Sequence, residues 1–575
     1  MRTTVAKFLR DTWTLTWPYF KSEERWSARG LLAVIVGFNL GQVYLSVQFN
    51  EWYNLFYNAL QERNEAEFYH QLLRFLVLAF LFIALIVYRI YLNQMLEIRW
   101  RRWLTTAFLD HWMARRAYYH MQLVDRGTDN PDQRIAEDLR MFVGQTIGYT
   151  LSLLREVVTL VSFMTILWGL SKDMQFFVWG VDVAFPGFMM WAAVLYAVIG
   201  TWLTHLVGRR LVRLNFDQQR FEADFRFSLI RFRENAEGIA LYGGEAGEKR
   251  GLVERFGNVL ANFWAIMKRQ KLLNMLTSTY GQLAVIFPYV VAAPRYFADP
   301  NAQIGILLQT GNAFGQVQGA LSWFVDAYAG LTEWKATVDR INGFAAAIER
   351  AATRPSDIVV AQDAAGALRL EDVGVALPDG STLLRHADAT VAPGEAVLVR
   401  GPSGSGKSTL FRAIAGIWPY GGGTVHWPRD ARVLFLPQRP YLPIGTLRAV
   451  ICYPAAEGAV GDAELRAVME ACGLGAFTDK LDEAHNWSLR LSQGEQQRIA
   501  FARALVIKPD WLFLDEASSA LDQATEDRVY RLIRERLPAT TVVSIGHRAS
   551  LEQYHDRALE VRPAPDGGAL VTSGP

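Results

Sequence analysis

Residues 401–408 read Gly-Pro-Ser-Gly-Ser-Gly-Lys-Ser and match the pattern G-x-x-x-x-G-K-[ST] in full. Closely spaced glycines let backbone N–H groups approach phosphate oxygens, the lysine neutralises β- and γ-phosphates, and the serine hydroxyl is a ligand for Mg²⁺. The pattern follows an apolar strand at 396–400 and precedes a helix expected at 409–415, the context that this chemistry requires. The segment therefore predicts a phosphate-binding loop made of Gly401, Pro402, Ser403, Gly404, Ser405, Gly406, Lys407, Ser408 and Thr409.

A second pair of reactive side chains follows an apolar strand at 511–514, which ends in Asp515 and Glu516. In a parallel sheet this edge would place Asp515 near the metal ion and Glu516 near a water that attacks the γ-phosphate. The pair alone is weak evidence for a catalytic site, because strands often end in acidic residues.

Four further features indicate the class of protein. Gln438 follows a strand at 433–437, the run Leu491-Ser492-Gln493-Gly494-Glu495-Gln496 opens a helix, Asp522 closes an Ala-Leu-Asp run, and His547 follows a strand at 542–546. This order resembles the ATP-binding cassette of ABC transporters. The resemblance implies ATP and Mg²⁺ as cofactors and an α/β cassette that hydrolyses ATP.

The resemblance also implies a role for each motif. Glu516 would polarise the attacking water, His547 would contact the γ-phosphate, and Gln438 would sense the metal together with Ser408 and Asp515. Residues 491–496 would be the signature that contacts ATP bound by the opposite subunit, and Asp522 would belong to the loop that crosses the dimer. One phosphate-binding loop and one signature imply a half-transporter that works as a homodimer.

Two departures from the family pattern concern ATP contacts. The signature reads LSQGEQ where LSGGQ is commoner, but it keeps Ser492 and Gly494. Leu377 precedes Pro378-Asp379-Gly380, where the family usually has an aromatic residue that stacks on adenine. We therefore expect weaker discrimination of the base, or an aromatic ring supplied from elsewhere.

The first part of the chain has a different composition. The 575 residues are 51% hydrophobic and 20% charged, and 59 basic against 57 acidic residues leave no charge excess that would indicate a nucleic-acid partner. Two cysteines exclude a disulfide scaffold and a cysteine-rich metal site. A helix needs about 20 apolar residues to cross a membrane. Six spans are expected at 31–49, 75–88, 157–171, 183–208, 272–294 and 302–325, the second one completed if Arg74 and Arg89 reach the interfaces.

The basic residues predict the orientation of these spans. Arginines gather in the segments between spans two and three and between spans four and five, which have helical spacing and are expected to project as long helices. The positive-inside rule then places both termini and both long loops in the cytoplasm. Residues 8–28 are expected to form an amphipathic helix along the inner interface.

Amide side chains in the last two spans suggest the kind of cargo. They are Gln309, Asn312 and Gln316 in span six and Asn274 and Gln282 in span five. Polar groups facing lipid are costly, so these should face a partner helix or a wet cavity. We favour a hydrophilic cavity, while hydrogen bonding between helices alone remains open.

Other segments narrow the resemblance. Residues 130–134 (Asn-Pro-Asp-Gln-Arg), 233–244 and 436–443 are similar to motifs of peroxisomal fatty-acyl half-transporters and their bacterial relatives. Residues 56–60, 321–324 and 333–334 resemble the SbmA/BacA peptide uptake proteins. Bacterial members that fuse this membrane half to a cassette import cobalamin, peptides and other hydrophilic compounds. The resemblance implies a location in the bacterial inner membrane.

The sequence thus predicts an all-α, six-span transmembrane domain of the ABC exporter type at 1–341, a linker at 342–366 and an α/β cassette at 367–575. The expected function is ATP-driven import of hydrophilic cargo such as peptides or cobalamin. The alternatives are an acyl-CoA or fatty-acid transporter and a lipid or drug exporter. An ATP-gated channel or regulator is disfavoured by the intact Glu516 and His547, and a lipid-modifying membrane enzyme by the absence of a recognisable catalytic cluster in the spans.

Overall fold

The computed structural model describes residues 2–124, 130–172, 175–178, 181–184, 186–298, 302–363, 366–563 and 569–573. The chain forms two compact units, which we call the helical unit (Met1–His111 and Asp129–Ala346) and the cassette unit (Trp112–Thr128 and Ala347–Pro575). Each unit is described by itself.

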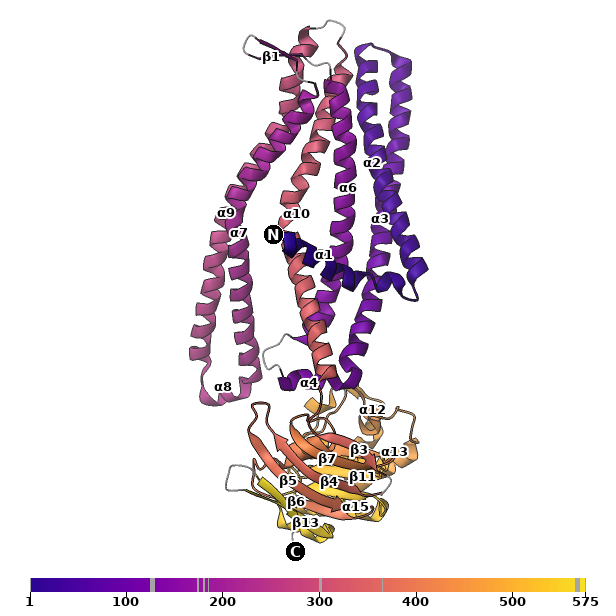
Figure 1. Ribbon diagram of the computed structural model, residues 1–575, viewed down its shortest axis with the longest axis vertical. Helices are drawn as coiled ribbons and strands as arrows, with labels where there is room; N and C mark the ends of the chain where they lie inside the picture. Colours follow the sequence, from indigo (N-terminus) through magenta and orange to yellow (C-terminus); the bar gives the residue numbers. More distant parts are fainter. Residues whose placement is uncertain are drawn as a thin grey trace. The chain divides into compact units, whose positions relative to one another are not determined.

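Long helices make up the helical unit (Figure 1). In chain order the elements up to its end are α1 (Arg2–Thr16), α2 (Arg25–Gln61), α3 (Glu65–Met113), α4 (Ala117–Val124), α5 (Pro131–Gln133), a π-helical turn (Arg134–Asp138), α6 (Leu139–Ser171), strands β1 (Gln175–Val178) and β2 (Val181–Ala184), α7 (Phe188–Glu234), α8 (Ala236–Tyr242), α9 (Glu245–Ala298) and α10 (Ile304–Thr353). Helix α4 belongs to the cassette unit. Helices α7 and α9 pack along each other and are joined by α8, which confirms that the arginine-rich segment between spans four and five is helical.

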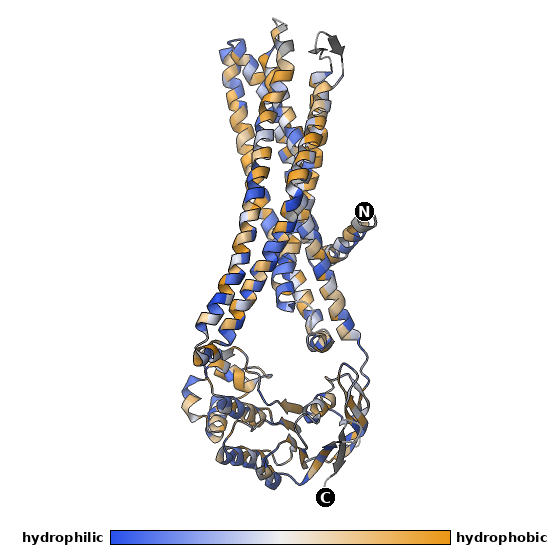
Figure 2. Ribbon diagram, turned by 90° about the vertical axis from the view of Figure 1, so that its left-hand side faces the viewer, coloured by the Kyte–Doolittle hydropathy of each residue, from blue (hydrophilic) through white to orange (hydrophobic). Residues whose placement is uncertain are grey.

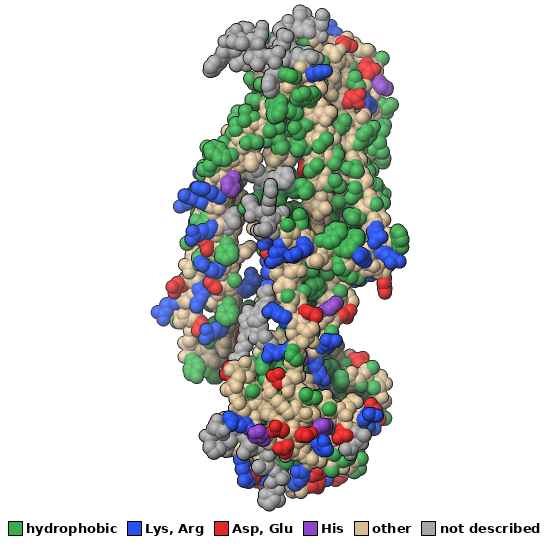
Figure 3. Space-filling view, viewed as in Figure 1, with side chains coloured by type: hydrophobic (Ala, Val, Ile, Leu, Met, Phe, Trp, Pro, Cys, Tyr) green, Lys and Arg blue, Asp and Glu red, His purple; other side chains and the backbone are tan. Residues whose placement is uncertain are grey.

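Five helices of the described chain are long and apolar enough to cross a membrane: α2, α3 with its continuation, the helix from Pro131 to Ser171, α7 and α9. Large apolar side chains such as Leu76, Val77, Phe80 and Ile83 of α3 are more than half exposed, as expected for a face that contacts lipid. Figure 2 shows the hydrophobic residues along the helices, and Figure 3 shows hydrophobic side chains on one face of them. The sixth expected span, 302–325, falls in the continuous helix α10, whose amide side chains lower its hydropathy.

The structure corrects several expected boundaries. The fourth span begins at Phe188, after the β1–β2 hairpin. The expected helix at 8–28 is divided, because α1 ends at Thr16 before Pro18 and α2 begins at Arg25. The expected linker at 342–366 is largely regular structure, since α10 continues to Thr353 and strand β3 occupies Val359–Asp363.

Arg89 also differs from expectation. Its Nη1 donates to Asn39 Oδ1 at 3.1 Å and to Gln42 Oε1 at 2.7 Å, so the side chain turns toward α2 rather than extending to an interface. Both amides are buried. The polar atoms of α2 thereby accommodate a guanidinium within an apolar helix.

The cassette unit is built on a ten-stranded sheet in the order β3-β7-β4-β5-β14-β13-β6-β12-β11-β8. Its strands are β3 (Val359–Asp363), β4 (Leu368–Ala376), β5 (Thr382–Val391), β6 (Ala396–Arg400), β7 (Gly421–Pro428), β8 (Val433–Leu436), β11 (Trp511–Asp515), β12 (Thr541–Ile545), β13 (Arg557–Pro563) and β14 (Ala569–Ser573). The helices of this unit are α4, α11 (Lys407–Ile414), α12 (Leu447–Cys452), α13 (Asp462–Ala471), α14 (Gln493–Ile507) and α15 (Gln523–Arg536), and a two-stranded ladder pairs β9 (Gly445–Thr446) with β10 (Ala484–His485).

The parallel strands β6, β12, β11 and β8 position the chemistry. They are neighbours in the sheet, and the central residues of β6, β11 and β12 are buried on both faces, while β8 at the edge is only partly buried. Because parallel strands end at the same edge, the residues that follow each strand meet there. The edge beyond Arg400, Asp515 and Ile545 therefore carries the site.

Helix α4 is part of the same unit. Leu123 packs against the apolar cluster of the cassette, and Arg116 Nη1 donates to the carbonyl of Ala415 at 3.1 Å. The expected continuous transmembrane domain is thus interrupted at 112–128 by a short segment that folds with the cassette.

Candidate active site

The phosphate-binding loop leaves β6 and enters α11. Gly401, Gly404 and Gly406 have φ values of 151°, 80° and 89°, which favour glycine. A Cβ on Gly401 would lie 2.6 Å from the carbonyl oxygen of Val561, so this position has no room for a side chain. The hydroxyl of Ser405 is buried without a hydrogen-bond partner among the described residues. An open loop of N–H groups with a spare hydroxyl suits a phosphate group.

Lys407 is 5% exposed, and its Nζ donates to the carbonyls of Gly401 at 2.9 Å and Pro402 at 2.7 Å. Burial lowers the pKa of Lys407, while the carboxylates of Glu516 and Asp515 act in the opposite direction. The ammonium group is therefore held within the loop, ready to exchange carbonyl oxygens for phosphate oxygens.

Ser408 and Asp515 form the candidate metal pair. The Ser408 hydroxyl donates to Asp515 Oδ1 at 2.8 Å. Burial raises the pKa of Asp515, an effect that a bound cation would reverse. The described residues contain no group of three or more His, Cys, Asp or Glu side chains that could hold a metal ion by themselves. This donor set fits Mg²⁺, which is usually bound through one or two protein oxygens together with phosphates and water.

Glu516 lies between the other two predicted catalytic residues. Gln438 Nε2 donates to Glu516 Oε2 at 2.9 Å, and His547 Nε2 lies 3.2 Å from Glu516 Oε1. Glu516 has a φ of 50°, an uncommon conformation for a residue with a side chain and one that concentrates at functional sites. The structure thus brings together Glu516, His547 and Gln438, while no hydrogen bond of the described residues joins Gln438 to the Ser408–Asp515 pair.

The signature opens α14. Ser492 is its N-cap, and a capping box joins the Ser492 hydroxyl to the Glu495 backbone while the Glu495 carboxylate accepts from the Ser492 backbone N–H at 2.8 Å. Glu495, one of the two departures from the common motif, therefore stabilises the helix start. A Cβ on Gly494 would approach the carbonyl of Ala520 to 3.2 Å, which explains the glycine.

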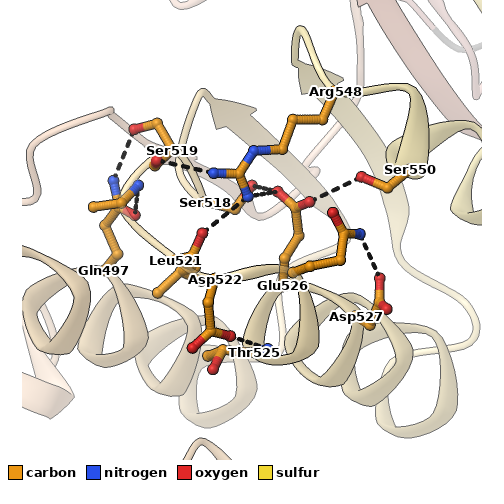
Figure 4. Close-up of polar contacts among 12 residues, drawn as sticks. Gln497, Ser518, Ser519, Leu521, Asp522, Thr525, Glu526, Asp527, Arg548 and Ser550 are labelled. Atoms are coloured by element: carbon orange, nitrogen blue, oxygen red, sulfur yellow. Dashed lines mark hydrogen bonds and ion pairs between the residues drawn. The ribbon is translucent and has the colours of Figure 1, made fainter.

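Asp522 caps α15 by accepting the N–H of Thr525 at 2.7 Å, and this bond is the main reason why the pKa of Asp522 is lowered. Figure 4 shows Asp522 among polar groups that the sequence did not single out. Gln497 donates from Nε2 to the Gln438 carbonyl and to Ser519 Oγ, both at 3.1 Å. Gln497 thereby connects the signature helix to the segments after β8 and β11.

Arg548 is another residue that the motif analysis missed. Its Nη1 donates to the carbonyl of Leu521 at 2.9 Å and its Nη2 to that of Ser519 at 3.3 Å. The only sign of this role in the sequence was the position of Arg548 directly after His547. Its partners are backbone carbonyls, which every residue type has, so they leave no pattern in the sequence.

The candidate cavity residues are not brought together as one site. Gln309 and Asn312 of α10 accept hydrogen bonds from Asn54 and Asn50 of α2 at 2.7 Å and 3.0 Å. Gln316 is half-buried, and Asn274 and Gln282 of α9 are exposed. At Gln309 and Asn312 the amides therefore bond helix to helix, the alternative that the sequence left open.

Comparisons with known proteins agree with this geometry. Residues 15–297 match the family described as ABC transporter transmembrane region 2, and residues 384–519 match the ABC transporter family. The Escherichia coli inner membrane ABC transporter ATP-binding protein YddA is 32% identical over 563 residues, covering 98% of each chain. The chain belongs to the ABC transporter family.

Two further comparisons give a curated relative and a match to the fold. The human lysosomal cobalamin transporter ABCD4 is 28% identical over 535 residues, 85% of each chain. A bacterial Atm1-family ABC exporter with ATP bound matches the fold with a TM-score of 0.71 at 18% identity, covering 94% of each chain. The predicted fold class is confirmed: a helical transmembrane domain of the exporter type is followed by an α/β cassette. The ABC transporter is an ATPase that couples hydrolysis to transport, with relatives of the D family.

Proposed function

We propose that this ABC transporter works as a homodimeric half-transporter that imports hydrophilic compounds, such as peptides or cobalamin, across the bacterial inner membrane, with both termini in the cytoplasm. The inner-membrane relative YddA and the membrane-spanning helices support a multi-pass inner membrane protein. The similarity of 56–60 and 321–324 to SbmA/BacA uptake proteins supports import, and the arginine-rich loops support the orientation.

The proposed homodimer follows from an incomplete site. Within one chain Ser492 bonds to Glu495, and no hydrogen bond of the described residues joins residues 491–496 to residues 401–409. A second copy would supply its signature to this phosphate-binding loop. In the assembled site, Ser408 and Asp515 would hold Mg²⁺, Glu516 would polarise water with Gln438 and His547 beside it, and Asp522 would face the partner.

The hydrophilic cargo is inferred from an amide seam between α2 and α10, made of Asn50, Asn54, Asn58, Gln303, Gln309 and Asn312. Asn58 Nδ2 donates to Gln303 Oε1 at 3.0 Å, and its Oδ1 accepts the Gly305 N–H at 2.8 Å. The Oδ1 of Asn50 is buried without a partner in the described structure, which leaves an acceptor for water or a polar cargo. This acceptor is the observation that carries the proposal, with Gln316, Asn274 and Gln282 as further candidates.

A second candidate is transport of acyl-CoA or fatty acids. The observation that favours it is Arg89, whose guanidinium meets amide oxygens of Asn39 and Gln42 instead of a carboxylate. A cation within an apolar helix suits an anionic cargo. The third candidate is a lipid or drug exporter. The Atm1-like fold supports it, although the same fold is compatible with import and with export.

Transport into right-side-out and inside-out membrane vesicles tests the proposal. Right-side-out vesicles loaded with ATP should accumulate labelled cobalamin or peptide, and Glu516→Gln should abolish accumulation while keeping ATP binding. Uptake into inside-out vesicles given external ATP would instead establish an exporter. Labelled acyl-CoA in the same assay decides the second candidate, because its movement without movement of cobalamin or peptide would overturn the hydrophilic-cargo proposal.

A further inference from the structure

Glu526, on the first turn of α15, is a buried carboxylate to which the hydrolysis chemistry described above assigns no role. It is 0% exposed. Its oxygens accept from Ser518 Oγ at 2.6 Å and Ser550 Oγ at 3.0 Å, and Arg548 Nη1 lies 3.4 Å away (Figure 4). A buried carboxylate is costly unless it is paired and hydrogen-bonded, and these three partners meet both conditions.

The partners of Glu526 come from two segments that are far apart in sequence. Ser518 lies between Glu516 and Asp522, on the segment that follows β11. Arg548 and Ser550 follow His547, on the segment after β12. Glu526 therefore joins the two segments whose first side chains, Glu516 and His547, meet at the reacting end of the sheet.

Arg548 extends the connection to the backbone. Besides facing Glu526, it donates to the carbonyls of Ser519 and Leu521, which precede the cap residue Asp522. Glu526 neutralises this guanidinium and fixes its direction. Without the Glu526 carboxylate, Arg548 would still donate to the two backbone carbonyls, but its positive charge would have lost the carboxylate that faces it.

The connection through Glu526 bears on the relative position of His547 and Glu516. His547 Nε2 and Glu516 Oε1 are 3.2 Å apart, His547 is exposed, and Glu516 has the uncommon backbone conformation noted above. Glu516 is partly buried and accepts from Gln438 Nε2 at 2.9 Å. The loops that carry Glu516 and His547 therefore contribute to setting their separation.

We propose that Glu526 is a positioning residue for ATP hydrolysis: through Ser518, Arg548 and Ser550 it holds Glu516, His547 and the Asp522 loop in one arrangement. The residue acts on turnover and leaves nucleotide binding unaffected, because the phosphate-binding loop and Lys407 make no bond to it in the described structure. A misplacement of about 1 Å at a catalytic group can lower a rate about 100-fold.

The test measures steady-state ATPase activity of the full-length protein in liposomes. Glu526→Gln keeps the size of the side chain and an acceptor for the serines but removes the charge that faces Arg548. We expect kcat to fall at least tenfold while KM for ATP changes less than twofold. Glu535→Gln, on an exposed position of the same helix, is the matched control and should leave both constants unchanged.

A combination of variants separates positioning from simple destabilisation. If Glu526 acts through Arg548, the double variant Glu526→Gln with Arg548→Gln should be no slower than the slower single variant, because the two act as a unit. Independent, multiplied losses of kcat would overturn the proposal. So would a wild-type kcat in Glu526→Gln, or a rise in KM that matches the fall in kcat.

Ser550→Ala covers the case in which Glu526→Gln does not fold. It removes one hydrogen bond to the carboxylate and leaves the charge pair in place, so kcat should fall twofold to fivefold with an unchanged KM. An unchanged kcat in this variant would contradict the proposed connection.

Discussion

Asp138 is the centre of a buried ion cluster in the helical unit. Its removal should lower the free energy of unfolding far more than removal of an ordinary surface carboxylate. The side chain is 2% exposed. It accepts from Arg340 Nε at 2.9 Å and Nη2 at 2.8 Å, a fork that uses both carboxylate oxygens, and it also pairs with Arg134 of the π-helical turn. The cluster therefore joins the start of α6 to the second half of α10.

The change Asp138→Asn keeps the shape of the side chain but removes the negative charge that faces Arg340 and Arg134. Breaking a buried pair in this way costs about 3–5 kcal/mol. At about 2 °C per kcal/mol for a large domain, the unfolding temperature should fall by roughly 6–10 °C. The loss should be visible in detergent as earlier aggregation or earlier exposure to protease on heating.

The matched control is Asp339→Asn, since Asp339 pairs with Lys335 on the exposed face of α10. These side chains are 47% and 41% exposed, and such pairs contribute about 0–1 kcal/mol. If Asp138→Asn and Asp339→Asn lowered the unfolding temperature equally, the reasoning about burial would be refuted. A triple change of Asp138, Arg134 and Arg340 to apolar residues should recover much of the stability, because the three charges of the cluster are then removed together.

Three further predictions concern the cassette. Lys407→Ala should weaken binding of a fluorescent ATP analogue about 10- to 150-fold, the value of a charged hydrogen bond of about 1.5–3 kcal/mol, without loss of the folded protein. Burial raises the pKa of Asp515 in the folded protein above that of an ordinary aspartate. The nucleotide-free fold therefore loses stability as the pH rises through these two pKa values and the carboxylate ionises. Asp515→Asn should therefore raise the unfolding temperature at pH about 7 and have no effect at pH about 3, and equal effects at both pH values would contradict this cause. Leu377→Tyr should increase the preference for ATP over GTP in kcat/KM about 5- to 150-fold if a ring at this position stacks on the base, and an unchanged preference would show that the base is bound elsewhere.

The cassette could be predicted closely because its chemistry is local in sequence. Glycines 401, 404 and 406 require a special backbone, and the apolar runs before Arg400, Asp515 and Ile545 can only be buried strands. The resemblance to the ATP-binding cassette implied the roles of Glu516, Gln438 and His547, and parallel strands that end at one edge explain why these residues meet. The contacts of Gln497, Glu526 and Arg548 did not follow, because they depend on backbone carbonyls and serines that no spacing rule selects.

The boundaries of the helical unit were predicted less well, for a physical reason. Residues 342–353 were interpreted as linker because they are rich in alanine and precede Pro355, yet alanine has the highest helix propensity. The helix α10 therefore continues until Thr353 and ends just before Arg354 and Pro355, where the residue before proline disfavours the helical conformation. Arg89 shows the converse error: hydropathy indicates that an arginine interrupts a span but cannot show that Asn39 and Gln42 of another helix accept its hydrogen bonds.

The departures in the signature show how a family pattern and local physics can be reconciled. The common motif has glycine and glutamine where this chain has Gln493 and Glu495, while Ser492 and Gly494, the residues expected to meet phosphate, are kept. In the structure Glu495 completes a capping box with Ser492, so the variant residue orders the start of α14. The Ser492 hydroxyl also donates to Glu495 Oε2 at 2.8 Å. In the proposed homodimer, closure would exchange this serine–carboxylate bond for a serine–phosphate bond, and Glu495→Gln should ease the exchange, because an amide is a weaker acceptor than a carboxylate.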